Sequence, residues 1–347
     1  MIRALQITGA GQAALTSLEM PAIGPDDVLI RSYAAGICGS DIELYRGTRP
    51  TGFYRYPVIP GHEWSGEIAA LGERVHTLSI GQKVVAEGFL YCGSCPSCRN
   101  GMTNLCEAGY DELGFTRPGG LAEYVAVPAR QVHALPDDAS LEEAALLEPT
   151  AVVAHAFLLA PPQPGSQLAI IGDGTIGLLA VQLARLYSPA VLMVLGAHDE
   201  RLELARCLGA THILNVRKEE PLPSIEAVTG GRGMDLIFEG GSRPAGVDLA
   251  LQAVRRGGTV LLEGIAGASA TLQLTSDLFV LKHLHVQGIF GANSAAWSFA
   301  VQLFTAGILQ LTDLISHRFS LDDYQAAFKT VEQRENKPLK VLLRHNR

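Results

Sequence analysis

Four cysteines, Cys92, Cys95, Cys98 and Cys106, lie within fifteen positions of the chain. Glycines and a proline between them supply turns, so the loop is tight enough to close around one tetrahedral ion. Four thiolates with no open position describe a structural zinc site, which holds together a loop that has little core of its own. An iron–sulfur cluster and four reduced cysteines without metal are the alternatives. We therefore expect this segment to be structural, and by itself it indicates no reaction.

A second segment with a chemical signature is the predicted strand, turn and helix around Gly172, which carries the pattern G-x-G-x-x-G. Gly172 makes the turn, Gly174 lets the backbone approach a pyrophosphate, and Gly177 lets the helix pack closely on the strand. The helix N-terminus, at Thr175 and Ile176, faces the phosphates. A glycine-rich turn without a ligand is the alternative. The strand before the pattern and the strand–helix units after it favour a dinucleotide site.

The residues after the next predicted strand bear on the choice between NAD and NADP. An NAD-specific site usually has Asp or Glu at the end of that strand, where it binds the ribose hydroxyls. Here the strand runs into Gly196 and His198 with no acid at the expected place, and Asp199 is expected to be a helix N-cap. The position has room for a 2′-phosphate, with His198 or Arg201 as its partner. The sequence slightly favours NADP and leaves NAD open.

Three further segments contain residue types that bind zinc: Cys38, the pair His62 and Glu63, and Glu148. Three protein ligands with one open position are what a catalytic zinc requires. Each residue alone also has an ordinary structural interpretation. Cys38 could be a small buried hydrophobe, His62 a core histidine, and Glu148 a solvated charge or a helix cap.

The chain has two regions with different patterns of apolar and turn residues, and together they indicate an α/β protein with two kinds of domain. Up to about Leu147 short apolar runs, such as Asp27–Arg31 and Lys83–Ala86, alternate with Gly and Pro turns, which predicts an irregular β-rich domain. From about Leu168 strands and helices alternate, which predicts a parallel, doubly wound sheet. The expected strands are 168–171, 191–195, 212–215, 234–239, 259–264 and 285–289, and the expected helices are 175–186, 200–208 and 245–254. After about residue 288 the chain should return to the first domain, with a strand at 341–343.

At 347 residues the chain is long enough for two domains. Its formal charge of −8 argues against a nucleic-acid partner, which needs a basic surface. The opening residues lack the pattern of a signal segment, and the longest apolar stretch, around Ala144–Ala160, is interrupted by polar residues. We therefore expect a cytoplasmic protein without a membrane partner.

In this order, and with the cysteine cluster between the second and third segments, these residues resemble the zinc-containing medium-chain alcohol dehydrogenase family. The resemblance covers essentially the whole chain. Glu148 followed by Pro149 is similar to the polyol (sorbitol-type) and threonine dehydrogenase branch. The resemblance implies a GroES-like catalytic domain of residues 1–150 and 289–347 around a Rossmann domain of residues 151–288. It also implies a homodimer or homotetramer.

When the functional residues of the family are transferred to the matching positions of this sequence, the resemblance implies that Cys38 and His62 bind the catalytic zinc. Glu63 and Glu148 would supply the third ligand between them, directly or through water. Asp41 would hold the His62 ring from outside the ligand set. With the cysteine cluster, the chain would bind two zinc ions. The catalytic zinc would lower the pKa of a bound alcohol, whose carbon then gives a hydride to NAD or NADP.

Two departures from the family pattern leave the substrate open. Ser40 is implied to bond the substrate hydroxyl and start a proton relay, but the next relay member, often a histidine, is here Glu43, which either relays a proton or is a surface charge. Sorbitol-type enzymes usually carry an arginine near residues 288–291, and here the position is Gly291. Four aromatic residues either line the pocket or serve packing: Tyr45, Tyr54, Trp64 and Tyr110.

The leading hypothesis is an enzyme that oxidises a secondary alcohol (a polyol, sugar alcohol or cyclitol-like compound) to a ketone. The runner-up is a threonine-type 3-hydroxy amino acid dehydrogenase, which needs an anion-binding group that the sequence does not reveal. A non-catalytic nucleotide-binding relative should lack the zinc-ligand set, which is intact here. A thiol-based sensor needs exposed, reactive thiols, and four close thiolates favour a saturated metal site instead.

Overall fold

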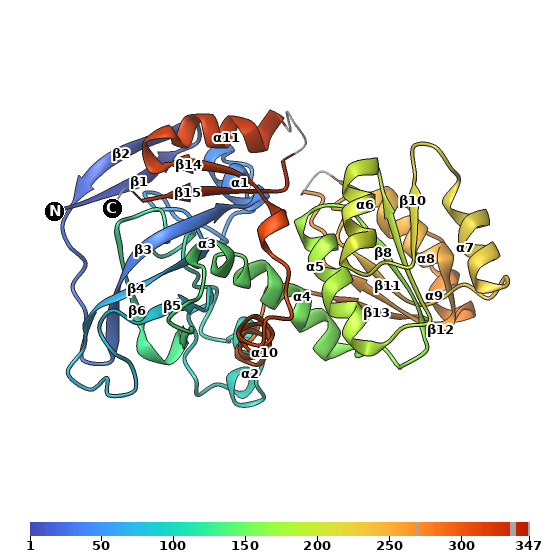
Figure 1. The fold of residues 1–347 in the computed structure, drawn as a ribbon, viewed down its shortest axis with the longest axis horizontal. Helices are drawn as coiled ribbons and strands as arrows, with labels where there is room; N and C mark the ends of the chain where they lie inside the picture. Colours follow the sequence, from blue (N-terminus) through green and yellow to red (C-terminus); the bar gives the residue numbers. More distant parts are fainter. Residues whose placement is uncertain (268–269, 334–337, 346–347) are drawn as a thin grey trace. The chain divides into compact units, whose positions relative to one another are not determined.

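The computed structural model describes residues 1–267, 270–333 and 338–345. The chain forms two compact units, Met1–Ala151 with Ala292–Arg347 and Val152–Gly291 (Figure 1). The second unit is therefore inserted into the first, with boundaries close to residues 150 and 288, where the pattern of apolar and turn residues changes along the sequence.

The first unit is built on a sheet with strand order β14-β15-β3-β4-β5-β7, with β6 paired to β3 and a separate β1-β2 hairpin. The strands are β1 (Ile2–Gly9), β2 (Gln12–Leu18), β3 (Asp27–Ile37), β4 (Glu63–Leu71), β5 (Lys83–Ala86), β6 (Tyr124–Pro128), β7 (Val132–Ala134), β14 (Ile315–Ser320) and β15 (Lys340–Arg344). The helices are α1 (Gly39–Arg46), α2 (Pro96–Arg99), α3 (Leu141–Ala144), α10 (Ser294–Thr305) and α11 (Tyr324–Gln333), and α4 (Leu147–Leu159) runs from this unit into the second.

Strand β3 is longer than the predicted Asp27–Arg31 because it lies in the middle of the sheet. It pairs with β4, β6 and β15, and nearly all of its residues from Val28 to Ile37 are buried. A strand covered on both faces shows no alternation of apolar and polar residues, so its end is hard to locate in the sequence. The core around it includes Trp64 and Ile68 of β4.

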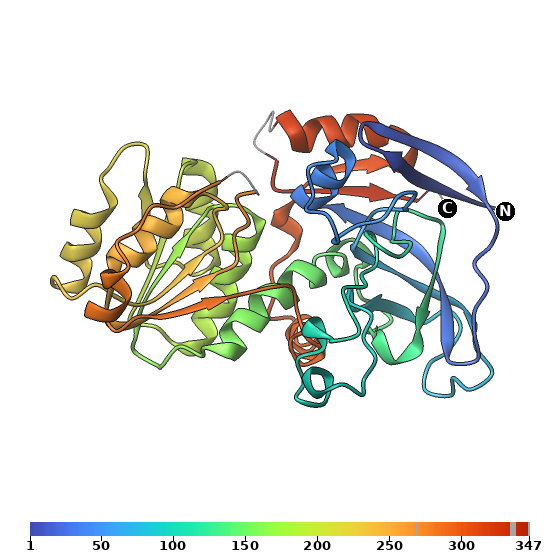
Figure 2. The same ribbon diagram turned by 180° about the vertical axis from the view of Figure 1, so that it is seen from behind.

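The second unit is a parallel sheet with strand order β10-β9-β8-β11-β12-β13. The strands are β8 (Gln167–Ile171), β9 (Val191–Gly196), β10 (His212–Asn215), β11 (Met234–Glu239), β12 (Val254–Leu262) and β13 (His285–Gly288), and the helices are α5 (Thr175–Ala184), α6 (Asp199–Leu208), α7 (Pro221–Thr229), α8 (Pro244–Ala253) and α9 (Asp277–Leu281). Helices α5 and α6 cover one face of the sheet and α8 the other (Figures 1 and 2). The order of strands reverses between β8 and β11, the position at which doubly wound sheets bind nucleotides.

Several elements of this unit differ from the prediction, among them helix α9, which was not predicted. Helix α5 ends at Ala184 and a 3₁₀ turn, Arg185–Tyr187, follows it. Strand β12 begins at Val254 rather than residue 259, because an irregular pairing with β11 and the left-handed Gly257 let the strand continue past a kink. Helix α7 was not predicted; it begins with a proline at a first-turn position, where the missing N–H costs no helical hydrogen bond.

Candidate metal sites and nucleotide loop

The cysteine cluster forms a group of four close sulfur atoms. The Sγ atoms of Cys92, Cys95, Cys98 and Cys106 all lie within 4.8 Å of one another. Helix α2 starts between them, because Cys95 is its N-cap and Pro96 its first residue. The spacing and the all-sulfur donor set fit one tetrahedral ion of the kind that closes a structural zinc site.

The backbone around this cluster favours thiolates. The backbone N–H groups of Ser94 and Cys95 donate to Sγ of Cys92 at 3.4 and 3.3 Å. The Ser94 hydroxyl and these N–H groups lower the pKa of Cys92 to about 5. Burial raises the pKa of Cys98 to about 12, so a thiolate at that position requires a cation beside it.

The second group of ligand-type residues comes from two neighbouring strands of the first unit. Cys38 follows β3, and His62 immediately precedes Glu63, the first residue of β4. The antiparallel pairing of the two strands places Gly36 opposite Glu63 and so brings their ends together. One ligand atom each of Cys38, His62 and Glu63 lies within 4.8 Å of the others, and the histidine and the glutamate are buried. A thiol, an imidazole and a carboxylate are a donor set that suits a catalytic zinc.

Asp41, in the first turn of α1, supports this group. Its Oδ2 accepts a hydrogen bond from the backbone N–H of Cys38 at 2.8 Å, and its Oδ1 lies 3.5 Å from Nδ1 of His62. Burial acts to raise the pKa of Asp41, but His62 and backbone N–H groups outweigh it and the pKa is lowered. Burial acts to lower the pKa of His62, but Asp41 and Cys38 hold it well above its ordinary value.

Two glutamates, Glu63 and Glu148, are candidates for the third zinc ligand beside Cys38 and His62. Glu63 is in the close group, yet its carboxylate accepts hydrogen bonds from Nζ of Lys340. Glu148, in the first turn of α4, is outside the close group but near enough to interact electrostatically with both His62 and Glu63. Burial, reinforced by Glu63, raises the pKa of Glu148 to about 8. Binding of a cation here would favour the ionised form of this carboxyl group.

The two residues expected in a proton relay lie on α1, one helical turn apart. Ser40 and Glu43 are both partly exposed, and their i, i+3 spacing places them on neighbouring parts of the helix surface. Within the described part of the chain neither side chain has a polar contact with the Cys38–His62–Glu63 group.

The glycine loop has the shape that a pyrophosphate needs. Gly172 has a φ of 120°, and a Cβ on Gly177 would lie 2.0 Å from the carbonyl oxygen of Gly172, so helix and strand approach closely. Nothing lies within 4 Å of the Cβ position of Gly174. Because Gly174 is also the N-cap of α5, no side chain covers the first N–H groups, at Thr175 and Ile176. The open space and these donors fit a bound phosphate group.

Asp173, an acid in the glycine loop that the sequence did not indicate as part of the site, reaches the end of β9. The Oδ2 of Asp173 accepts hydrogen bonds from the backbone N–H groups of Ala197 and His198, both at 2.8 Å, and lies 2.9 Å from Nδ1 of His198. Its Oδ1 lies 3.7 Å from Nη1 of Arg201. A Cβ at Gly196 would come within 2.6 Å of Asp173, so a glycine at the strand end makes room for this acid.

The expectation for Asp199 was wrong. The N-cap of α6 is His198, and Asp199 is the first helical residue. Its carboxylate accepts hydrogen bonds from Asn215 and Lys218 at 2.7 and 2.8 Å, which ties α6 to the end of β10 and to the segment after it.

The four candidate aromatic residues have different surroundings. Trp64 is a core residue, Tyr45 packs on Phe328 and Tyr54 on Tyr56, whereas Tyr110 forms hydrogen bonds with Arg49 and Glu112.

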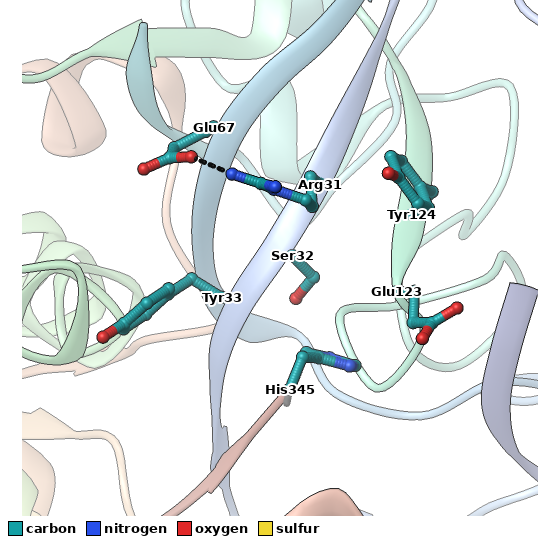
Figure 3. A pocket seen from close by; sticks show the side chains of 7 residues that line it. All are labelled: Arg31, Ser32, Tyr33, Glu67, Glu123, Tyr124 and His345. Carbon is teal, nitrogen blue, oxygen red and sulfur yellow. Dashed lines mark hydrogen bonds and ion pairs between the residues drawn. The ribbon is translucent and has the colours of Figure 1, made fainter. Parts of the chain in front are cut away.

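A surface hollow of about 250 Å³ lies elsewhere in the first unit (Figure 3). Its lining residues come from β3, β4, β6 and the segments beside them: Arg31, Ser32, Tyr33, Glu67, Glu123, Tyr124 and His345. Arg31 donates to Glu67 at 2.5 Å within it. None of these seven residues belongs to the metal-ligand groups or the glycine loop.

Comparison with known proteins shows the class of protein to which the chain belongs. Residues 24–137 match the alcohol dehydrogenase GroES-like domain, and residues 175–306 match the zinc-binding dehydrogenase family. The fold is thus a GroES-like domain combined with a Rossmann domain, and the chain is an enzyme of the kind that acts on CH–OH groups.

Individual relatives give the branch. Sorbitol dehydrogenase of Bacillus subtilis (strain 168) is 35% identical over 338 residues, covering 96% of this chain and 94% of that protein. L-threonine 3-dehydrogenase of Bacillus velezensis is 35% identical over 318 residues, covering 91% of each. A crystal structure of a zinc-binding dehydrogenase-type protein from Sinorhizobium meliloti 1021, bound to NADP, superposes with a TM-score of 0.90 at 29% identity and covers 99% of both chains. The chain belongs to the zinc-containing medium-chain dehydrogenase family, in its polyol and threonine dehydrogenase branch.

Among the described helices, none combines the length and the apolar character needed to cross a membrane.

Proposed function

We propose that this enzyme oxidises a secondary alcohol of the polyol, sugar alcohol or cyclitol type to a ketone, with zinc and NAD or NADP. The observation that carries the proposal is the group of Cys38, His62 and Glu63, whose ligand atoms lie within 4.8 Å of one another in a zinc dehydrogenase fold. The sorbitol dehydrogenase relative supports the polyol class. The threonine dehydrogenase relative keeps a 3-hydroxy amino acid as the second candidate.

In this proposal each chain holds two zinc ions. Cys92, Cys95, Cys98 and Cys106 hold the structural ion; Cys38, His62 and Glu63 or Glu148 hold the catalytic one. When bound, the catalytic zinc polarises the substrate hydroxyl and the nicotinamide accepts a hydride.

The protein's own groups orient the reactants and move the proton. The carboxylate of Asp41 lies 3.5 Å from Nδ1 of His62 and stabilises the charged form of the ring. Ser40 accepts the proton of the substrate hydroxyl and passes it outward, with Glu43 as the next group on the same helix. The loop from Gly172 to Gly177 binds the pyrophosphate.

For the nucleotide we favour NADP. His198 and Arg201 place two basic groups at the end of β9, beside Gly196, and Asp173 holds both in position. Similar proteins of known structure bind either nucleotide: the Sinorhizobium meliloti protein is bound to NADP, and a protein from Escherichia coli CFT073 is complexed with NADH. The alternative is NAD, with the carboxylate of Asp173 binding a ribose hydroxyl.

We also propose a cytoplasmic homodimer or homotetramer. None of the six cysteines, all of which the structure describes, forms a disulfide, which suits a reducing compartment. Strand β13 is an edge strand with every residue exposed, and the neighbouring Val280 and Leu281 are 79% and 68% exposed. An exposed sheet edge with exposed apolar residues beside it pairs readily with a second copy of the same chain.

The test is reduction of NAD and of NADP, followed at the nicotinamide absorbance, with polyols, cyclitols, threonine and simple secondary alcohols. Turnover that a zinc chelator abolishes supports the proposal. Absence of turnover with both nucleotides in protein that contains its zinc would refute it.

A further inference from the structure

An arginine that neither the family match nor the sequence analysis singles out lies beside the proposed catalytic site. Arg49 is in the loop between α1 and β4, and its side chain is only 11% exposed. Its guanidinium carbon lies 3.6 Å from the centre of the Phe115 ring. The centre of the same ring lies 4.8 Å from that of His62. The guanidinium is therefore separated from the His62 imidazole by no more than the sum of these two distances.

The surrounding residues fix the orientation of Arg49. Its Nε donates to the carbonyl oxygen of Phe53 at 2.9 Å, and its Nη2 donates to the hydroxyl of Tyr110 at 2.9 Å. Tyr110 in turn donates to Glu112, which is buried. The direct separation between Nη2 of Arg49 and Glu112 is 3.9 Å, longer than a hydrogen bond, so the contact with the carboxylate runs mainly through the tyrosine.

These contacts leave part of the guanidinium available. Stacking on Phe115 uses the flat face of the group, whereas its N–H bonds point outward in the plane. Among the described residues, Nη1 of Arg49 has no hydrogen-bond partner, and Nη1 is also not one of the fully buried unpartnered atoms. Two N–H donors of a permanent cation, on a side chain held by its neighbours, thus have no partner among the described residues, and the guanidinium and His62 both pack on Phe115.

We propose that Arg49 recognises an anionic group, a carboxylate or a phosphate, on the secondary alcohol that this enzyme oxidises. This inference rests on the proposed function, and it narrows the substrate class to alcohols that carry an acid group a few bonds from the reacting hydroxyl. A guanidinium edge pairs with two oxygens of either anion, which a neutral polyol cannot match. Arg49 would supply the anion-binding group that a hydroxy amino acid, a sugar acid or a sugar phosphate requires.

The test compares steady-state kinetics of the zinc-loaded enzyme on matched substrates. These are a neutral polyol, the same polyol with a terminal phosphate, the corresponding sugar acid, and threonine. In the wild-type protein we expect a lower KM for at least one anionic substrate than for the neutral polyol. Replacement by R49Q should lower the ratio of kcat/KM between that anionic substrate and the neutral polyol by about 10- to 100-fold, mainly through KM, which is the usual effect of a lost charged hydrogen bond.

Two further variants separate recognition from a structural role. R49K keeps the charge and loses the planar fork, so it should retain part of the preference. R46Q removes an exposed arginine of α1 that pairs with Glu332, and it should leave the ratio unchanged. Inorganic phosphate should compete with the neutral polyol in the wild-type protein and not in R49Q.

The outcomes distinguish the two proposals. The phosphate and carboxylate substrates show which anion is recognised. If wild-type protein oxidises neutral polyols without preferring any anionic substrate, the role of Arg49 is refuted and the proposed function stands. An equal loss on neutral and anionic substrates in R49Q would show that Arg49 only holds its loop. No turnover of any alcohol would refute the proposed function itself.

Discussion

Lys340 donates hydrogen bonds from Nζ to both carboxylate oxygens of Glu63, at 2.7 Å from Oε1, although 277 positions separate the two residues. Both are buried. Burial acts to lower the pKa of Lys340, but Glu63 and Cys38 outweigh it, so the pKa is raised and the lysine is held as a cation. The last strand of the chain thus supplies the counter-charge for an acid at the start of β4.

Replacement of Lys340 by methionine should therefore destabilise the first unit. It leaves the carboxylate of Glu63 buried without its partner, and breaking a buried pair in this way costs about 3–5 kcal/mol. The free energy of unfolding is measured by urea denaturation at constant zinc concentration. In the K340M/E63Q double variant part of the loss should return, because no charge is left unpaired. If the effects of K340M and E63Q simply add, the two side chains are not coupled.

The cysteine cluster should hold one of two zinc ions. Metal analysis of the purified protein should give two zinc ions per chain. Cys92→Ser should lower the content to one and reduce the stability of the first unit, because the loop loses its cross-link. Cys207→Ser is the matched control, since this exposed cysteine lies outside the cluster. Two zinc ions retained in Cys92→Ser would contradict the structural-site assignment.

The parts of the site that the sequence predicted are those in which neighbouring residues act together. The cysteine spacing and the glycine loop are local patterns. In the structure the four cysteine sulfur atoms lie close together, and the glycines allow helix and strand to approach closely. Strands β5, β10 and β11 likewise have the predicted bounds, because each is a short apolar run between turn residues.

The parts that could not be predicted depend on long-range packing. Lys340 meets Glu63 only because β15 pairs with β3, which pairs with β4. The carboxylate of Asp173 reaches His198 across 25 positions, and no local pattern marks it as the acid at the end of β9. Arg49 lies in a loop without regular structure, and its position depends on contacts with Tyr110 and Phe115 from a later segment.

His62→Ala should abolish turnover and leave nucleotide binding intact. His62 belongs to the first unit, whereas the glycine loop belongs to the second. Loss of one ligand removes the site that polarises the substrate hydroxyl but changes none of the donors at Thr175 and Ile176. Turnover is measured by nicotinamide absorbance and nucleotide affinity by calorimetry. A comparable loss of nucleotide affinity would refute the assignment of His62 to the catalytic metal.

Two carboxyl groups beside the glycine loop should make the stability of the second unit depend on pH. Glu239 ends β11, and its backbone oxygen accepts hydrogen bonds from the N–H groups of Glu263 and Gly264 at 3.0 and 3.1 Å. The Oε1 of Glu239 accepts from Gly241, whereas its Oε2 is buried with no partner among the described residues. Burial raises the pKa of Glu239 to about 7, and burial together with Glu239 raises the pKa of Glu263 to about 7.

The direction of the effect follows from proton binding. Between the ordinary pKa of 4.5 and about 7 the folded protein holds more protons on these groups than the unfolded chain, so stability falls as the pH rises through this range. Glu263→Gln keeps the shape without the charge and should raise the stability at pH 8 by about 1–3 kcal/mol, with little change at pH 4.5. Calorimetric Tm values over this range test it, with the exposed Glu226→Gln as control. An equal shift of Tm at both pH values in Glu263→Gln would show that packing, rather than the charge of Glu263, accounts for the difference.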